Sequence, residues 1–473
     1  MALTPRALPL AAALLALVLA FTLARPREVP GPALRDFEAY WAAGASWSSG
    51  DDAYSRQIWR AERTVPGVVA TREELLPFIG PPFGLPFWAF FARFDYSTAA
   101  LFWRIILCLA FAALTLGALE LAGARSDWCD RLAVLVLGAG FGPLTSGLAL
   151  GQVAILSAAA ALATLMALRS KQTLLAAGAA LVAALQPNIG ITLAARFGER
   201  RANIALVLAG FVAVGGSVVA AGGLRTALRY LAVVREHRDA ELFLAIQTTP
   251  IAIARAFGAA PIAAEIFGVV LALGVIAALV LQCLSRRYDG VERFGLASAA
   301  LPLTWPFAHE HDFALALFPA IVCLRRCAGG AWAAAAFGAL LVAIDWLGFA
   351  QRPSALAQSA LLAFAAMLAI AVLGGGRVRA LRFTPALVVA LAVPIGLLTR
   401  SHTLAIWPNA LPAFFKVPIA MPAPQLWAFE QHLVGIDALD PWWGFLRGLP
   451  LLGCAMLWYA LSRLRAQPHA PRP

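Results

Sequence analysis

Long apolar runs separated by short charged clusters make up most of the chain. Several of these runs reach the roughly 20 residues that cross a hydrocarbon core. Examples are Ala99–Leu121, Ile204–Val219 with its flanks, and Pro261–Leu284. Arginine pairs punctuate the runs, as topology signals do. The pattern therefore predicts an all-α polytopic membrane protein with roughly eleven to thirteen transmembrane helices.

The composition agrees with this prediction. Of the 473 residues, 61% are hydrophobic and only 13% are charged, whereas about a quarter of a soluble domain is charged. The net charge of +12 does not indicate nucleic-acid binding, because no basic stripe with interleaved aromatic residues accompanies it. The six cysteines lie in or beside apolar runs without zinc-site spacing. We expect neither a metal nor a cofactor.

The first apolar run, Ala7–Leu23, is either a cleaved signal peptide or an uncleaved helix with a cytoplasmic N-terminus, and the many later runs favour the uncleaved helix. The loop that follows, residues 25–76, is the most polar stretch and carries Trp41, Trp47 and Trp59. Tryptophan at this density suits the membrane–water interface. We expect this loop to form an extracytoplasmic cap of short interfacial helices.

Two later segments have basic ends and a polar centre, which predicts pairs of half-length helices. One breaks at Gln186-Pro187-Asn188 and the other at His309–Asp312. Broken helices are tolerated where they line a cavity, so we expect both breaks on the same side as Asp36. The run Phe78–Phe94 contains three prolines, so a full span and a re-entrant or interfacial segment are both open.

Ionisable groups at membrane depth are costly and are therefore functional candidates. Asp36 is the candidate general base toward an acceptor hydroxyl, and a helix cap is the alternative role. Several cations fall in a stretch expected outside, Gly222–Ala260, where they either bind a phosphate through paired N–H groups or contact lipid headgroups. The phosphate-binding candidates are Arg225, Arg229, Arg235, Arg238 and His311.

His309 and His311 have two interpretations. They could bind a metal, but a spacing of two residues does not place both on one helical face. A hydrogen bond from one of them to a phosphate or to the base is therefore favoured. Signatures of soluble enzymes, such as a P-loop or a GxSxG element, are missing from the sequence.

A set of motifs resembles glycosyltransferase family 87, which includes bacterial polyprenol-phosphate-mannose-dependent mannosyltransferases. The first is Asp-Phe-x-x-Tyr-Trp-Ala-Ala-Gly, beginning at Asp36. The others follow in the family's order: Gly50-Asp-Asp-Ala-Tyr54, Gly80-Pro-Pro-Phe83, Gly151-Gln-Val153, Gln186-Pro-Asn188, Thr249-Pro-Ile-Ala252 and the tip Ala308–Asp312. The resemblance covers roughly residues 1 to 330. Two departures are Gln186, where the family has lysine, and Gly80, where it has an aromatic residue.

The resemblance implies a bundle like that of type C glycosyltransferases, with the active site on the extracytoplasmic face of the bacterial inner membrane. It implies transfer of a hexose, mannose by the family's example, from a polyprenyl-phosphate donor to a lipid or glycan hydroxyl, with inversion. Asp36 would be the base. Supporting polar candidates are Tyr40, Gln152, Gln186, Asn188, His309 and Asp312.

Two other functions are open. One is a transporter or flippase of a lipid-linked or small substrate, although the sequence has no internal repeat of the kind many transporters show. The other is a non-catalytic scaffold for envelope assembly. In either case we divide the chain into a core at 1–330, additional C-terminal helices at 331–465, and a disordered tail at 466–473.

Overall fold

The computed structural model describes residues 6–23, 32–123, 126–285, 287–346, 356–375, 395–402, 404–417, 421–436 and 440–464. Throughout these ranges the regular structure is helical, with no strand. The predicted C-terminal tail, 466–473, lies outside the described residues. The all-α fold class is confirmed.

The longer helices are α1 (Ala7–Leu23), α5 (Tyr96–Leu121), α8 (Ala154–Arg169), α11 (Arg200–Ala220), α12 (Leu224–Glu241), α14 (Pro261–Leu284), α15 (Gly290–Thr304), α17 (Gly329–Ala343), α19 (Leu356–Gly374) and α22 (Pro441–Ser462). The shorter helices are α2 (Arg35–Ser48), α3 (Trp59–Glu62), α4 (Leu85–Phe91), α6 (Trp128–Ala139), α7 (Gly142–Leu150), α9 (Thr173–Ala183), α10 (Pro187–Ile191), α13 (Pro250–Ala256), α16 (Leu317–Arg326) and α21 (Ala423–Val434). Single 3₁₀ turns are η1 (Arg56–Ile58), η2 (Pro82–Gly84), η3 (Thr192–Arg196) and η4 (Glu310–Ala316).

In the described part of the chain, five helices are long and apolar enough to cross a membrane, namely α5, α11, α14, α19 and α22. The α6–α7 pair, bent by 63°, is a sixth candidate if it counts as one span. Helix α11 exposes large apolar side chains, including Phe211 at 77% and Val219 at 82%. Such an apolar face suits lipid rather than water. Since other apolar helices are shorter and residues 376–394 are outside the described part, the total of eleven to thirteen stays a prediction.

The proline-rich run Phe78–Phe94 is not a full span. It forms the turn η2 and the seven-residue helix α4, and Asp95 then caps α5 by accepting a hydrogen bond from the Thr98 N–H. Proline fixes the backbone and removes an N–H donor, so it starts helices more readily than it continues them. The interfacial or re-entrant alternative is therefore the one that fits.

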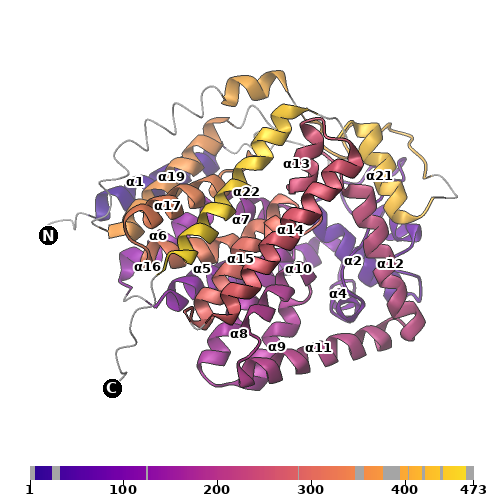
Figure 1. The fold of residues 1–473 in the computed structure, drawn as a ribbon. Coiled ribbons are helices and arrows are strands. Elements are labelled where there is room, and N and C mark those ends of the chain that lie inside the picture. The colour runs from indigo at the N-terminus through magenta and orange to yellow at the C-terminus, as the bar shows by residue number, and fades with distance from the viewer. Residues whose placement is uncertain are drawn as a thin grey trace.

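The first helix packs against a helix from the C-terminal third of the chain. Helix α1 packs against α6 and α19, while α22 packs against α15 and α17. Figure 1 shows α1, α6, α17 and α19 on one side of the molecule and α2, α4, α12 and α21 on the other. The described part of the polar first loop forms α2, η1 and α3, which matches the expected cap of short helices. The residues discussed below gather between this cap, α12 and the broken helices.

Candidate active site

Helix α2 is held rigidly, which fixes Asp36 in its first turn. Phe37 is fully buried and stacks on Trp103 of α5 with ring centroids 5.6 Å apart. Gly44 lies against the backbone of α4, where an added Cβ would come within 2.4 Å of Trp88 carbonyl atoms. A larger residue there would separate the two helices. Packing of Phe37 on α5 and of Gly44 on α4 thus explains the Asp-Phe…Gly spacing of the first motif.

Asp36 pairs with the Gly-Gln motif. The Gln152 side-chain amide donates a hydrogen bond to Asp36 Oδ2, and the Tyr40 hydroxyl donates to Gln152 Oε1 at 3.3 Å. Gly151 has a φ of 81°, and a Cβ there would lie 2.8 Å from Leu34 Cβ, so the close approach favours glycine. The structure therefore brings together Asp36, Tyr40 and Gln152.

The two broken helices meet at Asp312. Its Oδ1 accepts hydrogen bonds from the side-chain amides of Gln186 at 2.9 Å and Asn188 at 2.8 Å. Its Oδ2 accepts from the His309 backbone N–H at 2.9 Å. A buried carboxylate needs such donors. Gln186, one of the two departures from the family's motifs, thus reaches Asp312 through an amide hydrogen bond.

His309 and His311 lie beside Asp36. Their rings stack with centroids 5.4 Å apart, and the charges of both act on the Asp36 carboxylate. The argument that a spacing of two residues keeps them off one helical face assumes an α-helix, which does not form here. His309 has an extended backbone at the start of a 3₁₀ turn, so helical periodicity does not apply there. Among the described residues, no group of three or more acidic, histidine or cysteine side chains could hold a metal.

Glu241 of α12 forms a second buried carboxylate centre, which the sequence reasoning missed. Its oxygens contact His309 Nε2 at 3.0 Å and His237 Nε2 at 3.3 Å. They also accept hydrogen bonds from Trp427 Nε1 at 2.7 Å and from the Gln247 amide at 2.8 Å. The available signal was the spacing of His237 and Glu241, which places both on one helical face. Trp427 could not have been found, because it comes from the distant α21.

Electrostatics separate the roles of these groups. Burial raises the pKa of Asp36, against the opposing charge of His311 and the hydrogen bond from Gln152. Burial alone lowers the pKa of His309, but the charge and hydrogen bond of Glu241 outweigh it and raise the value to about 8. Burial lowers the pKa of His311. The site thus holds a cationic His309 near pH 7, while His311 carries its charge only at lower pH.

Three of the four α12 arginines, Arg225, Arg229 and Arg235, are exposed on their helix, and Arg238 is half-buried. Arg229 pairs with Asp52 at 3.0 Å, and Arg238 pairs with Asp239 and Glu265 at 2.6 and 3.1 Å. Among the phosphate-binding candidates, only His311 is brought next to Asp36.

The second departure from the family motifs, Gly80, also has a local explanation. A Cβ at Gly80 would come within 2.7 Å of the Phe78 ring, which is buried and packs edge-on against Tyr40. The Tyr54 hydroxyl donates to the Gly80 carbonyl at 2.8 Å, joining two of the motifs. Phe78 thus occupies space that an aromatic side chain at position 80 would need.

These features define a class: an all-helical membrane protein with a buried carboxylate, amide and imidazole site between the cap formed by its first loop and two broken helices. Residues 78–306 match the model of glycosyltransferase family 87, so the resemblance seen in the motifs is confirmed over this part of the chain, and the match indicates a membrane glycosyltransferase. The match includes Gln152, Gln186, Asn188 and Glu241, while Asp36 and Asp312 lie on either side of it. No curated protein and no solved structure matches the chain.

Proposed function

We propose that the protein transfers a hexose, mannose by the family's example, from a polyprenyl-phosphate donor to an acceptor hydroxyl, with inversion at the anomeric carbon. Asp36 is the general base. The proposal places the protein in the bacterial inner membrane with this site facing outward. The observation that carries it is the Asp36 carboxylate, held by Gln152 beside the two stacked histidines.

In this mechanism Asp36 takes the proton of the acceptor hydroxyl as its oxygen attacks the anomeric carbon. The bond between that carbon and the phosphate oxygen breaks on the opposite face, and the electron pair leaves with the polyprenyl phosphate. The raised pKa makes the ionised Asp36 a stronger base than an exposed aspartate. Activity should therefore fall as the pH drops through that raised pKa, because the base becomes protonated.

The departing phosphate needs positive charge or hydrogen-bond donors. His309 supplies an imidazolium stabilised by Glu241, and His311 lies next to it. The exposed arginines of α12 are further candidates, either for the donor phosphate or for lipid headgroups. Asp312, Gln186 and Asn188 hold the broken helices and thereby position both histidines.

The test is transfer of radiolabel from polyprenyl-phosphate-mannose, and from other hexose donors, in membranes that contain each variant. Asp36→Asn should lower transfer by about 10²–10⁴-fold, the usual contribution of a general base. Asp51→Asn is the matched control, since Asp51 is an exposed aspartate of the same cap. Equal transfer by the Asp36→Asn variant and the control would remove Asp36 as the base. No transfer from any hexose donor by the unmodified protein would overturn the proposed function.

A further inference from the structure

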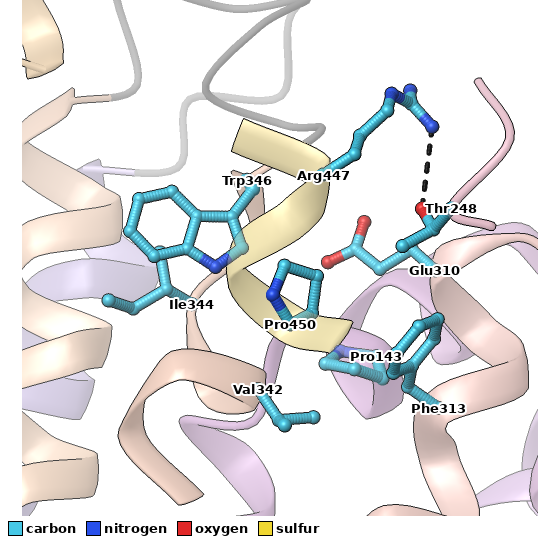
Figure 2. Close-up of a pocket in the computed structure, with 9 residues that line it drawn as sticks. All are labelled: Pro143, Thr248, Glu310, Phe313, Val342, Ile344, Trp346, Arg447 and Pro450. Carbon is cyan, nitrogen blue, oxygen red and sulfur yellow. Dashed lines mark hydrogen bonds between the residues drawn. The ribbon is translucent and has the colours of Figure 1, made fainter. Parts of the chain in front are cut away.

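A pocket lies between α7, α17 and α22, next to the broken helix that carries the histidines. Its enclosed cavity is small, about 20 Å³, and the empty space reaches about 300 Å³ only when the open mouth is counted. Its walls are mostly apolar, and its polar side chains are Thr248, Glu310 and Arg447. Figure 2 shows these three on one side of the pocket, with Val342, Ile344 and Trp346 on the other.

Arg447 is the unusual member of this pocket. It lies on α22, is only 6% exposed, and makes one long hydrogen bond, from Nη1 to Thr248 Oγ1 at 3.4 Å. Its Nε and Nη2 atoms are buried and find no hydrogen-bond partner among the residues that the structure describes. Leaving such donors unmet is costly, more so on a charged group. The position is therefore hard to explain by packing alone.

The two unmet nitrogens suggest the shape of the missing partner. Nε–H and Nη2–H point the same way along one edge of the guanidinium plane, and this pair binds two oxygens of a phosphate or carboxylate at once. The opposite wall, with Ile344, Val342 and Trp346, suits a hydrocarbon chain. A ligand with a phosphate attached to an apolar chain satisfies both halves of the pocket.

Glu310 places limits on this ligand. Its charge acts on Arg447, and it stands between His309 and His311 in the chain. A carboxylate beside the arginine disfavours a ligand with two negative charges and leaves a singly charged phosphodiester as the better match. Polyprenyl-phosphate sugars and anionic phospholipids are both phosphodiesters of this kind.

We propose that the Arg447 pocket binds the phosphate of a singly charged, lipid-linked phosphodiester through the Nε and Nη2 edge of the guanidinium. The source is either the sugar donor or a membrane phospholipid. This site lies outside the family-matched residues 78–306 and does not depend on sugar transfer. If the ligand is the donor, Arg447 anchors its phosphate beside the broken helix that carries the histidines.

The test is binding to the full-length protein in nanodiscs of neutral phosphatidylcholine, measured by native mass spectrometry. The probes are polyprenyl-phosphate-mannose, a polyprenol of equal length and phosphatidylglycerol. We expect the unmodified protein to prefer at least one phosphodiester over the polyprenol by about tenfold or more, as for a charged hydrogen bond. Preference for the first probe alone identifies the donor as the source, and preference for phosphatidylglycerol identifies a phospholipid.

Variants distinguish binding at the Arg447 pocket from nonspecific binding of lipid. Arg447→Gln should abolish the preference, and Glu310→Gln should strengthen it by removing the competing charge. Arg447→Lys keeps the charge but loses the paired N–H groups, so it should lose most of the preference and can replace Arg447→Gln if that variant does not fold. Arg463→Gln, at an exposed position on the end of α22, is the matched control.

Two results would overturn the site: equal binding of phosphodiesters and polyprenol by the unmodified protein, or an unchanged preference in both Arg447 variants. Asp36→Asn should bind as the unmodified protein does. Binding that persists while no hexose is transferred would leave this site standing and reject only the proposed transferase function.

Discussion

Helix α12 and the break at His309–Asp312 both carry many charged residues, yet the structure treats them in opposite ways. On α12 three of the four arginines are exposed and make exposed pairs, such as Arg229 with Asp52. At the break, Asp312 is buried and accepts three hydrogen bonds from Gln186, Asn188 and the His309 backbone. Exposed ion pairs contribute little, whereas buried charges persist only with dedicated partners.

The same contrast occurs within α12 itself. Its inward residues, His237 and Glu241, are 4% and 1% exposed and join the histidine cluster. A segment with many charged residues can therefore be an exposed surface as readily as a functional site. The number of partners that a buried polar group recruits from distant segments is the better guide to chemistry.

Among the changes that test this comparison, the largest effect is expected from Asp312→Asn, which removes the charge that joins the two breaks. An amide can accept fewer hydrogen bonds from Gln186, Asn188 and the His309 N–H, so the broken helices should lose their fixed geometry. We expect transfer to fall about 100-fold, because misplacement of about 1 Å can cost that much. The melting temperature in detergent should fall as well. Asp51→Asn is again the control, and transfer equal to that control would show that the junction does not position the site.

Glu241→Gln is expected to lower transfer by a smaller factor and to shift the pH profile in a defined direction. In the unmodified protein His309 is protonated below its pKa of about 8, so activity that needs this cation is lost as the pH rises through about 8. The substitution removes the charge that raises this pKa, so the loss should move to lower pH. Transfer at pH 7 should fall about tenfold, roughly 1.4 kcal/mol in the barrier. The measurement is the pH profile of kcat/KM.

Glu236→Gln is the matched control for that experiment, because Glu236 is exposed on the same helix. An alkaline limb that stays in place in Glu241→Gln would show that His309 does not supply the essential charge.

The smallest effect is expected from the exposed arginines of α12. Arg225→Gln and Arg235→Gln should each change transfer by less than about threefold, since exposed charges are screened by water and salt. Donor titrations in membranes of fixed lipid composition measure this. A rise of more than about tenfold in the KM for the donor would instead assign these arginines to the donor phosphate and reverse the comparison.

Much of the fold could be predicted from the apolar periodicity. The runs Ala7–Leu23 and Pro261–Leu284 are helices α1 and α14 with those boundaries, and both breaks fall where polar residues and proline interrupt the pattern. Phe78–Phe94 stayed open, because hydropathy alone does not say whether prolines start a short helix or bend a long one.

Site residues could be predicted only where they belong to one of the family motifs. Asp36, Gln152 and Asp312 stood in motifs, but their pairing needed helices to meet across more than a hundred residues of chain. The partners of Glu241 depend on how α12 packs on α21, and Arg447 reaches Thr248 across 199 positions. Such contacts follow from tertiary packing, which one sequence does not determine locally.

The most direct measurement is the structure of Asp36→Asn bound to polyprenyl-phosphate-mannose and an acceptor, determined by electron cryo-microscopy. The account predicts the acceptor oxygen within about 2.6–3.2 Å of residue 36, the hydrogen-bonding reach of a general base, with the anomeric carbon beside that oxygen. A sugar bound along the outward face of α12, with residue 36 far from both substrates, would contradict it.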